Sequence, residues 1–310
     1  MARYLITGGT GFVGRSLARV LQAGGDEVVL ATRGRHQDGG LQSWVEYDLR
    51  DRSTIANIIE ARPDGVFHLA WSTTPGSAES DPASDVQINL AGTLALFQEL
   101  SKNMPVPVVF VSSGGTVYGI AETLPITEGH PLRPIGIYGI TKASTEQYAL
   151  NFRERTKLDI RIARLANPFG AHQSVAKLQG AASIFARKII HREPITIWGD
   201  GSIVRDYVDV EDASAALSAI MRLSLGAAKA DPIYNIGSGE GLSLRTLIEE
   251  ISAYSSIAPN VRYTAERSFD IPANVLSISK IAKATGWKPR PVREALRDMT
   301  AAMLHSGSHD

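Results

Sequence analysis

The sequence predicts an α/β protein whose main part is a doubly wound parallel sheet, joined by a smaller α/β lobe in the C-terminal half. Two observations lead to this fold class. Short runs of Val, Ile and Leu alternate with helical stretches through the first half of the chain, and those runs contain few polar residues. A strand that is apolar throughout is covered on both faces, as in parallel sheets. Helices between successive strands supply the crossovers that parallel strands require.

The elements of the first half follow in order. We expect strands over residues 4–7, 27–32, 44–48, 66–70, 106–112 and 160–165. We expect helices between them, over residues 12–22, 53–61, 85–102 and 136–155. Residues 1–166 are therefore assigned to the first domain, which ends where the regular alternation ends.

The second half has longer loops and a less regular order of elements. We expect strands over residues 195–198, 204–208 and 233–236, and helices over 242–254 and 292–303. The strand at 233–236 is apolar enough to return to the first sheet. Residues 167–310 otherwise form the smaller, substrate-binding lobe.

Composition excludes several classes of function. The 310 residues include 32 Lys and Arg, 32 Asp and Glu, and no Cys. A net charge of zero gives no electrostatic reason to expect nucleic acid or a membrane surface as partner. The lack of Cys removes disulfides and thiolate chemistry, and it suits the reducing cytoplasm. We expect a cytoplasmic protein with no metal site and no apolar segment long enough to span a bilayer.

A glycine-rich turn follows the first strand. Gly8, Gly11 and Gly14 form the pattern G-x-x-G-x-x-G between that strand and the first helix. Backbone can approach a pyrophosphate closely only where no Cβ intervenes, and the helix N-terminus offers N–H groups to the anion. At the first βα junction, this pattern predicts a dinucleotide-binding, Rossmann-type domain.

The end of the second strand bears on which dinucleotide binds. An NAD site usually has Asp or Glu here to accept from the ribose hydroxyls. This chain has Thr32, Arg33 and Arg35. The arginines would suit the 2′-phosphate of NADP, or they are solvated loop charges, or Arg33 stacks on the adenine. The cofactor is therefore expected to be NAD, with NADP as the alternative.

Tyr138 and Lys142 stand four residues apart on one predicted helix face. A free phenol has a pKa of about 10 and is a poor base at neutral pH. A neighbouring ammonium and a cationic nicotinamide would both favour the phenolate. Because this helix follows the strand at 106–112, the pair is expected at the carboxyl edge of the sheet, where ligands bind.

Taken together, the motifs resemble those of the extended short-chain dehydrogenase/reductases, and most closely the UDP-galactose (UDP-glucose) 4-epimerases and related nucleotide-sugar epimerases. The resemblance covers nearly the whole chain. Besides the glycine loop and the Tyr–Lys pair, it rests on these segments: Asp48-Leu49, His68-Leu69-Ala70, Asn89 in Asn-Leu-Ala-Gly-Thr, Ser112 to Gly119, Asn167-Pro168, Trp198-Gly-Asp-Gly, Arg205-Asp206-Tyr207 and Arg267-x-x-Asp270.

The resemblance implies roles for individual residues. Those expected to bind the cofactor are Gly8, Gly11, Phe12, Val13, Gly14, Thr32, Arg33, Asp48, Leu49, Leu69, Ala70, Trp71, Asn89, Tyr138 and Lys142. Those expected to bind the nucleotide sugar are Thr116, Asn167, Gln179, Thr196, Trp198, Arg205, Arg267, Asp270 and Asn274. Tyr138 would be the base, Lys142 would hold the nicotinamide ribose, and arginines would hold the diphosphate, a task that suits their charged donors.

Two departures from the family pattern affect these roles. The family usually has a catalytic Ser or Thr where this chain has Gly114, so another hydroxyl must share the substrate's proton. Thr116 is the preferred candidate and Ser113 the other. Asn274 lies where some members carry a bulky Tyr against the sugar, which suggests room for an N-acetyl or carboxyl substituent.

The sequence therefore predicts a nucleotide-sugar 4-epimerase acting on a UDP-hexose or derivative by transient oxidation at C4. The alternative is an NADP-dependent nucleotide 4-keto-sugar reductase, motivated by Arg33 and Arg35. A sugar 4,6-dehydratase is less favoured, because Gly115 and Thr116 stand where such enzymes carry an Asp–Glu pair. A non-catalytic dinucleotide sensor is disfavoured by the intact Tyr–Lys pair. By analogy with the family, a homodimer would form through the helices at 85–102 and 136–155.

Overall fold

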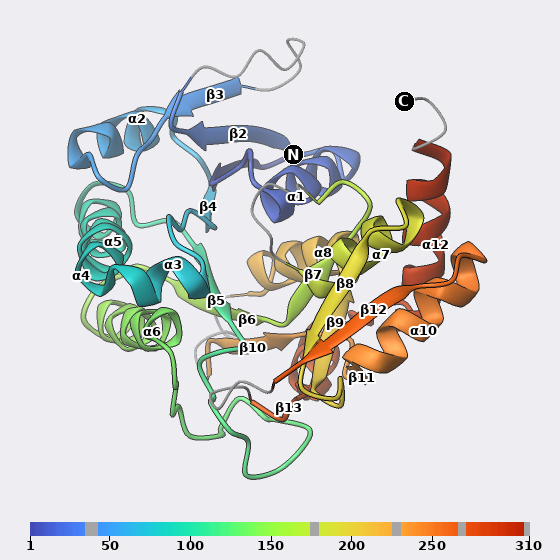
Figure 1. The fold of residues 1–310 in the computed structure, drawn as a ribbon. Coiled ribbons are helices and arrows are strands. Elements are labelled where there is room, and N and C mark those ends of the chain that lie inside the picture. Colours follow the sequence, from blue (N-terminus) through green and yellow to red (C-terminus); the bar gives the residue numbers. More distant parts are fainter. Residues whose placement is uncertain (35–42, 174–179, 225–230, 266–270, 307–310) are drawn as a thin grey trace.

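The computed structural model describes residues 1–34, 43–173, 180–224, 231–265 and 271–306 (Figure 1). In this described part the largest sheet has seven parallel strands in the order β10-β6-β5-β4-β1-β2-β3. They are β1 (Arg3–Thr7), β2 (Glu27–Thr32), β3 (Ser43–Glu46), β4 (Gly65–His68), β5 (Val108–Ser113), β6 (Ile160–Leu165) and β10 (Ile233–Ile236). The predicted doubly wound parallel sheet is confirmed, and every strand of it overlaps a predicted strand.

The order of the strands fixes where a ligand can bind. The chain runs from β1 outward to β2 and β3, then crosses back so that β4 lies on the other side of β1. At such a switch point the connections leave in opposite directions, and a crevice opens outside the carboxyl ends of the strands. The loops after β1, β4 and β5 all leave the sheet at this edge.

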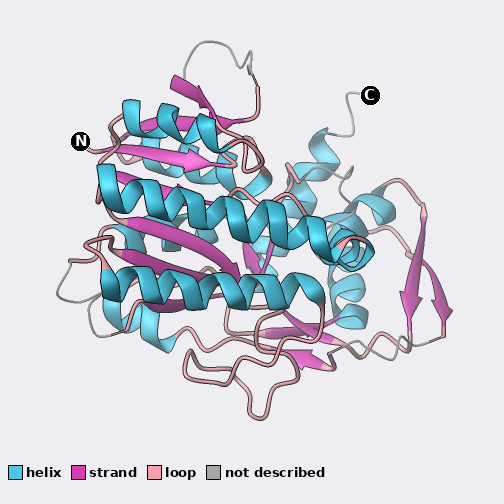
Figure 2. Cartoon of the chain, turned by 90° about the vertical axis from the view of Figure 1, so that its left-hand side faces the viewer, coloured by secondary structure: helices cyan, strands magenta, loops and turns pink. Residues whose placement is uncertain are grey.

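Helices cover both faces of the sheet. The helices that connect the first strands and complete the first domain are α1 (Phe12–Ala23), α2 (Ile55–Glu60), α5 (Ala91–Asn103), α6 (Ile137–Arg155), α8 (Val210–Met221) and α11 (Ser279–Thr285), with a short η1 (Arg52–Thr54) before α2. Helices α5 and α6 pack side by side, and Figure 2 shows helices lying across the front of the sheet. On the other face α1 packs against α8.

Side chains alternate between the two faces as strand geometry requires. Tyr4 and Ile6 of β1 belong to the core cluster that contains α1 and α8, whereas Leu5 belongs to the cluster that contains α2 and α5. Each is less than a tenth exposed. Fully burying such a side chain contributes roughly 1.5–3 kcal/mol, so the apolar runs in the sequence account for a doubly covered sheet.

The predicted helix over residues 85–102 is interrupted in the structure. It consists of α4 (Pro82–Asp85), a π-helical turn η2 (Val86–Leu90) and α5, and α3 (Pro75–Ser80) precedes it. A π turn is wider than an α turn and often lies at functional sites. Here it carries Asn89 and follows Asp85, and both side chains are fully buried.

Helix α8 was not predicted from the sequence. Asp209 caps it by accepting a hydrogen bond from the Glu211 amide, 2.8 Å away. Its Ser214 hydroxyl donates to Val210 O at 2.7 Å, and the Ser214 and Ser16 hydroxyl oxygens lie 3.0 Å apart, so small polar residues let α8 and α1 approach closely. A helix rich in Ala and Ser gives a weak apolar stripe, which explains why the prediction missed it.

The rest of the second half forms smaller sheets covered by three helices. The sheets combine β7 (Asn167–Phe169), β9 (Val204–Asp209), β11 (Gly241–Ser243) and β13 (Ala273–Asn274), and separately β8 (Pro194–Trp198) with β12 (Asn260–Thr264). The helices are α7 (Ala181–Ile190), α10 (Leu244–Ser255) and α12 (Val292–Ser306). They share one apolar cluster. Strand β10 leaves this region and pairs with β6; a domain boundary at residue 166 stays a prediction.

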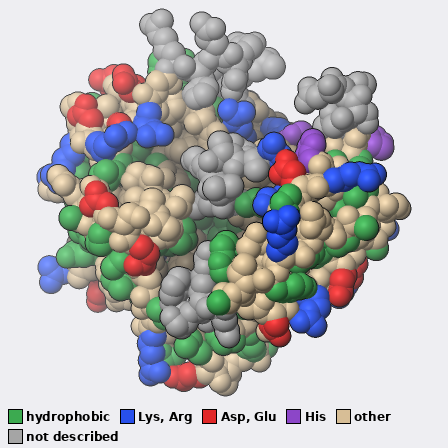
Figure 3. All heavy atoms as spheres, in the orientation of Figure 1, with side chains coloured by type: hydrophobic (Ala, Val, Ile, Leu, Met, Phe, Trp, Pro, Cys, Tyr) green, Lys and Arg blue, Asp and Glu red, His purple; other side chains and the backbone are tan. Residues whose placement is uncertain are grey.

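The visible surface carries charges of both signs. Figure 3 shows Lys, Arg, Asp and Glu side chains scattered over this face with no large patch of one sign. In the described residues, no helix is both long enough and apolar enough to cross a membrane.

Candidate active site

The glycine loop lies where backbone segments approach one another closely. Gly8 has a φ of +68°, and a Cβ there would lie 3.0 Å from the Ala70 amide nitrogen. A Cβ on Gly14 would lie 2.5 Å from the Gly8 carbonyl oxygen. Gly11 caps α1 without any side-chain hydrogen bond. The glycines at 8, 11 and 14 therefore bring no Cβ into this turn, and the first turn of α1 has free backbone N–H groups for an anion, as the predicted phosphate site requires.

A buried chain of hydrogen bonds joins β1 to β4 beneath this loop. Thr7 Oγ1 accepts from the amides of Leu69 and Ala70, at 3.2 and 3.1 Å. Having used both lone pairs, it donates its proton to His68 Nδ1, 2.8 Å away. His68 then carries its proton on Nε2 and donates to Thr93 Oγ1 at 2.9 Å.

This chain of bonds fixes the segment after β4. The predicted strand over 66–70 ends at His68: the Leu69 amide is shared between the carbonyl and hydroxyl oxygens of Thr7, and the Ala70 amide donates to the Thr7 hydroxyl alone. Leu69 and Ala70, predicted to line the dinucleotide, consequently lie beside Gly8, and Trp71, predicted to do the same, lies beside Tyr138 and Lys142. Leu49, also predicted to bind the cofactor, packs against α5: a Cβ on Gly92 of that helix would lie 2.5 Å from the Leu49 carbonyl oxygen.

Lys142 lies in an aromatic and carbonyl environment. Its ammonium donates to Val111 O at 2.8 Å and lies 3.6 Å from the centre of the Trp71 ring. It is 4% exposed. Burial lowers the pKa of Lys142 to about 7, while Glu146 and Asp85 act to raise it. The ammonium is therefore close to losing its proton at neutral pH.

Tyr138 lies one helical turn before Lys142, with its ring centre 6.0 Å from that of Trp71. The sequence argument expected a lowered phenol pKa here. In the chain by itself the direction is opposite: burial raises the pKa of Tyr138, and the charge of Asp85 raises it further. A cationic nicotinamide bound beside Tyr138 would act in the opposite direction and favour the phenolate.

Asn89 joins the segment after β4 to the π turn. Its Oδ1 accepts from the Ser72 amide and hydroxyl, at 2.7 and 2.9 Å. Its Nδ2 donates to Thr73 Oγ1 and to Asp85 Oδ1, at 3.0 and 2.8 Å. The oxygen and the nitrogen of the Asn89 side chain are thus both hydrogen-bonded to protein groups. Asn89 therefore holds the segment after β4 against the π turn.

The sequence analysis missed two acidic residues near the pair. Asp85 is four residues before Asn89, a helical spacing that could have revealed it. Glu79 of α3 accepts from the Ile137 amide at 2.7 Å and so caps α6, where Gly136 has no side chain to do so. No local sequence signal links Glu79 to residue 137, because the contact is made only by tertiary packing.

The loop after β5 carries the candidate hydroxyls. Thr116 Oγ1 and Ser112 Oγ are buried and have no hydrogen-bond partner among the described residues. A buried hydroxyl without a partner is costly, and a bound ligand would satisfy it. A Cβ on Gly115 would lie 4.0 Å from Ser113 Oγ and 3.9 Å from Asn167 Oδ1. Ser113, Thr116 and Asn167 therefore surround the same turn.

Gly114 has a structural reason to lack a side chain. A Cβ there would lie 2.5 Å from Leu276 Cδ1 and 3.0 Å from the carbonyl oxygen of Arg164. Asn274 is fully buried and donates to the Gly114 carbonyl at 3.0 Å. Asn274 therefore holds the loop after β5 through the Gly114 carbonyl. That its size leaves room for a sugar substituent stays a prediction.

A buried network holds this loop against α6. Tyr118 donates to Asn235 Oδ1 at 2.6 Å, and its oxygen accepts from Arg164 at 2.9 Å. Arg164 forms an ion pair with Glu146, with Nη2–Oε2 at 2.7 Å. Burial raises the pKa of Tyr118 to about 12, so it remains a neutral donor.

The end of β2 presents Arg33 to solvent beside Asp48. The Thr32 hydroxyl donates to Gly34 O at 2.8 Å, so it is already engaged by its own loop. Desolvation raises the pKa of Asp48, but Arg50, whose Nε lies 3.2 Å from the carboxylate, lowers it, and the net pKa is below the ordinary value. The charge of Arg33 also lowers it. Two guanidinium groups therefore lie close to the predicted adenosine end of the site.

The remaining predicted substrate residues lie on strands of the smaller lobe. Asn167 of β7 donates to Asp206 O on β9 at 2.8 Å. Arg205 of β9 donates to Ile271 O at 2.6 Å. Thr196 and Trp198 both face outward on β8, since the residues alternating with them are buried. Arg35, Gln179, Arg267 and Asp270 lie outside the described residues.

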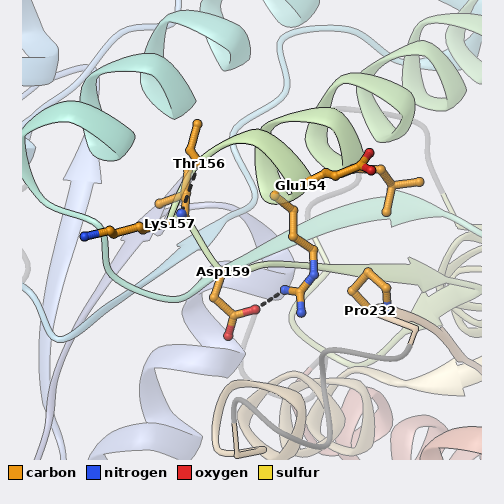
Figure 4. Close-up of a pocket in the computed structure, with 8 residues that line it drawn as sticks. Glu154, Thr156, Lys157, Asp159 and Pro232 are labelled. Atoms are coloured by element: carbon orange, nitrogen blue, oxygen red, sulfur yellow. Dashed lines mark hydrogen bonds and ion pairs between the residues drawn. The ribbon is translucent and has the colours of Figure 1, made fainter.

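A pocket of about 620 Å³ lies elsewhere in the described chain (Figure 4). It is formed by the C-terminal end of α6, the residues between α6 and β6, and Pro232. Along α6 it is roughly 24 Å from Tyr138 at 1.5 Å per residue. No group of three or more His, Cys, Asp or Glu within the described ranges could hold a metal ion.

Known proteins of similar sequence and structure were then compared with this chain. The model of the NAD dependent epimerase/dehydratase family matches residues 4–237. A putative UDP-glucose 4-epimerase of Methanocaldococcus jannaschii is 30% identical, over 92% of each chain. The crystal structure of the Thermus thermophilus UDP-glucose 4-epimerase in complex with NAD has a TM-score of 0.88 and 30% identity, covering 98% of this chain and 99% of that one. That of the Thermotoga maritima UDP-glucose 4-epimerase with UDP-glucose has a TM-score of 0.89 and 28% identity, covering 99% and 100%.

Proposed function

This chain belongs to the NAD dependent epimerase/dehydratase family, and from that premise we propose that it is a nucleotide-sugar 4-epimerase acting on a UDP-hexose or a UDP-hexose derivative. The observation that carries the proposal is the position of Tyr138 and Lys142. They lie on α6 beside Trp71, with Lys142 bonded to Val111 O near the carboxyl end of β5, and Trp71 follows the Ala70 backbone that meets Gly8 of the glycine loop. A site that only binds a dinucleotide has no use for this pair.

The residues present fit NAD. The cradle between Gly8, Gly14 and Ala70 is one that a Cβ would fill, and α1 has no side-chain cap at its N-terminus. Backbone N–H groups at this turn would hold the pyrophosphate. Lys142 would donate to the nicotinamide ribose. When bound, NAD would supply the hydride acceptor and donor at C4 of the sugar.

Tyr138 removes the proton of the C4 hydroxyl as the sugar is oxidised and returns it when the opposite C4 epimer forms. Thr116 contributes a hydroxyl that shares this proton, in place of the residue that Gly114 cannot provide. Both groups would then stabilise the same sugar oxygen. Asn167 and Arg205 are proposed to hold the diphosphate, as charged and amide donors do.

The first experiment is mass spectrometry of the small molecules released when the purified, unsupplemented protein is denatured. A 4-epimerase regenerates its cofactor in each cycle, so near-stoichiometric NAD is expected. UDP-glucose and UDP-N-acetylglucosamine are then supplied, and the C4 epimer is measured at equilibrium. No epimer from any UDP-hexose would refute the proposal.

Replacing Tyr138 by Phe tests the proposed base. Loss of a general acid–base group lowers the rate by about 10²–10⁴-fold, and we expect kcat to fall within this range while bound NAD is retained. The measurement is the initial rate of epimer formation, with released NAD quantified in parallel. Unchanged turnover would refute both the epimerase and the reductase mechanisms.

An NADP-dependent 4-keto-sugar reductase is the second candidate. It is favoured by the exposed Arg33 beyond β2, because a guanidinium cannot accept from a ribose hydroxyl. Released NADP, or a site that binds NADPH reversibly, would favour this candidate. Consumption of NADPH with a nucleotide 4-keto sugar would then establish it.

We also propose that the protein is a cytoplasmic homodimer. Val86 on η2 and Ile140 and Tyr148 on α6 are 44–49% exposed, although they are large and apolar. A partner protomer packed on these elements would cover them, and two-fold dimers are the commonest assembly. Sedimentation equilibrium measures the mass, and replacing Ile140 by Asp is expected to shift it toward the monomer.

A further inference from the structure

The Lys142 ammonium is a buried charge with no carboxylate bound to it in the described part of the chain. Lys142 is 4% exposed, and among the described residues its Nζ makes one hydrogen bond, to Val111 O at 2.8 Å. The nearest acidic residue along α6, Glu146, is bound by Arg164, with Nη2–Oε2 at 2.7 Å. A buried ammonium is costly unless other groups compensate its charge.

Aromatic rings surround this ammonium, and the ring of Trp71 is the nearest of them. Nζ lies 3.6 Å from the centre of the Trp71 ring, 5.0 Å from that of Phe110 and 5.9 Å from that of Tyr138. The negative face of an aromatic ring attracts a cation, most strongly in Trp and where water is excluded. The Trp71 face is therefore well placed to compensate the charge of Lys142.

The position of the Trp71 ring is fixed by the segment that carries it. The amide before it, Ala70 N, donates to Thr7 Oγ1 at 3.1 Å. The amide after it, Ser72 N, donates to Asn89 Oδ1 at 2.7 Å. The backbone on both sides of Trp71 is thus tied to β1 and to the π turn.

The same ring also contacts Tyr138. The two ring centres are 6.0 Å apart, with an interplanar angle of 72°, and edge-to-face contacts of this kind are favoured between aromatic side chains. The indole N–H does not hold the ring in place, because Trp71 Nε1 is buried and has no hydrogen-bond partner among the described residues. Ring contacts on a tethered backbone therefore place Trp71 against both Tyr138 and Lys142.

We propose that Trp71 is a positioning residue for Tyr138 and Lys142, and that its indole face holds the Lys142 ammonium in place of a counter-ion. A carboxylate would take up N–H donors of the ammonium, whereas an aromatic face attracts the charge as a whole. With one donor on Val111 O, the ammonium keeps another for a ribose hydroxyl. The catalytic part of this inference rests on the proposed function, and the electrostatic part concerns the chain alone.

A double-mutant cycle tests the contact in the full chain freed of bound nucleotide. Trp71→Leu removes the aromatic face and Lys142→Met removes the charge, and urea unfolding of the single variants, the double variant and wild type measures the coupling. A desolvated cation–π contact corresponds to a factor of about 30 in the unfolding equilibrium constant, and we expect a coupling of this order. Additive effects of the two substitutions would overturn the inference.

The matched control is the same cycle with Trp287→Leu. Trp287 is also partly buried, but its Nε1 donates to Asp212 O at 3.1 Å, on α8 at the face of the sheet opposite α6. This cycle should show no coupling with Lys142→Met. A coupling of equal size would mean that the first cycle reports a general loss of packing, and it would overturn the inference.

Fluorinated tryptophan tests the aromatic face without truncating it, so this measurement does not depend on the folding of the Leu variant. Fluorine withdraws charge from the ring and weakens its attraction for a cation. The free energy of unfolding should fall with each added fluorine in wild type and not in Lys142→Met. The chain has four tryptophans, and Trp71→Phe shows what fluorination of the other three does. Equal falls in wild type and Lys142→Met would contradict the contact.

Enzyme activity tests the catalytic part. A misplacement of the reacting groups by about 1 Å lowers the rate by about 100-fold, and we expect a fall of this order in kcat for Trp71→Leu. Trp71→Phe keeps a smaller aromatic face and should lose less than about tenfold. In the Tyr138→Phe background, Trp71→Leu should lower kcat little further, since its effect passes through the pair. Equal falls in the Phe and Leu variants would overturn the positioning role.

Failure of this inference and failure of the proposed function give different results. If the wild-type protein turns over no UDP-sugar, the proposed function fails. The unfolding cycle still decides whether Trp71 holds Lys142, because it needs neither substrate nor cofactor.

Discussion

At the scale of single residues, the candidate site is defined by hydroxyls that lack partners. Thr116 Oγ1 is buried and unpaired among the described residues, while the Gly114 position cannot take a side chain without moving Leu276 and meeting the Arg164 carbonyl. The crowding gives a steric reason for the lack of a side-chain hydroxyl at position 114, and Thr116 stays the preferred candidate for that role. Ser113 lies across the same turn and is the competing candidate.

Thr116→Val and Ser113→Ala distinguish the two hydroxyls. Val has the shape of Thr, so the variant removes the hydroxyl and little else. Loss of one preorganised donor typically lowers kcat by about 10²–10³-fold, and we expect this for Thr116→Val and a change below about tenfold for Ser113→Ala. Steady-state rates at saturating UDP-sugar provide the measurement, and the reverse ranking would assign the role to Ser113.

At the scale of elements, the predicted phosphate site depends on the close junction between β1 and α1. Gly14 is in the first turn of α1, and its Cα faces the Gly8 carbonyl across a gap with no room for a methyl group. The turn and the helix are thereby locked together. An anion bound at the helix N-terminus would be held by the same backbone that sets this packing.

Gly14→Ala tests this junction. The added methyl group must displace backbone, because a Cβ would lie 2.5 Å from Gly8 O and 2.8 Å from Gly9 Cα. Overpacking of this kind costs about 1–3 kcal/mol. We expect a lower free energy of unfolding and loss of copurified NAD.

Gly76→Ala is the control for that variant. Gly76 is in α3, and nothing lies within 4 Å of a Cβ built there. Ala in a helix is favoured over Gly by up to about 1 kcal/mol. Urea unfolding should therefore show unchanged or increased stability with NAD retained; equal losses in both variants would contradict the role of the junction.

At the scale of the whole molecule, buried polar groups connect segments that are distant in sequence. Asp206 on β9 accepts from Ser238 N, Gly239 N and Leu276 N, at 2.7, 3.2 and 3.1 Å. His68 connects β1, β4 and α5 through Thr7 and Thr93. Such contacts hold the binding edge together, and they make stability depend on protonation.

His68 should make the protein sensitive to acid. Its pKa is about 6.5 in an unfolded chain and is lowered to about 3 in the fold, chiefly by burial. Between these values the unfolded chain binds the extra proton, so stability is lost as pH falls below about 6.5. The expected loss from this group is about 2 kcal/mol at pH 5.

Urea unfolding of wild type and His68→Gln at pH 7 and pH 5 measures this effect. The variant should start less stable and lose less between the two pH values. His191→Gln, at an exposed position, should behave as wild type. An equal pH dependence in the His68 variant would show that His68 is not the responsible group.

The sequence by itself determined the parallel sheet, the glycine loop and the Tyr138–Lys142 pair, because each depends on local signals: continuous apolar runs, residues without Cβ, and a four-residue helical spacing. It could not find α8, whose Ala- and Ser-rich face became informative only once α1 was packed against it.

Tertiary structure alone decided how the predicted residues act on one another. It placed Glu79 on the N-terminus of α6, restricted the room for a side chain at Gly114 through Leu276 and the Arg164 carbonyl, and buried Asp85 against Thr73 and Asn89. These effects depend on distance and burial between segments far apart in the chain. A pKa and a steric limit are properties of a packed environment, and the order of residues does not contain them.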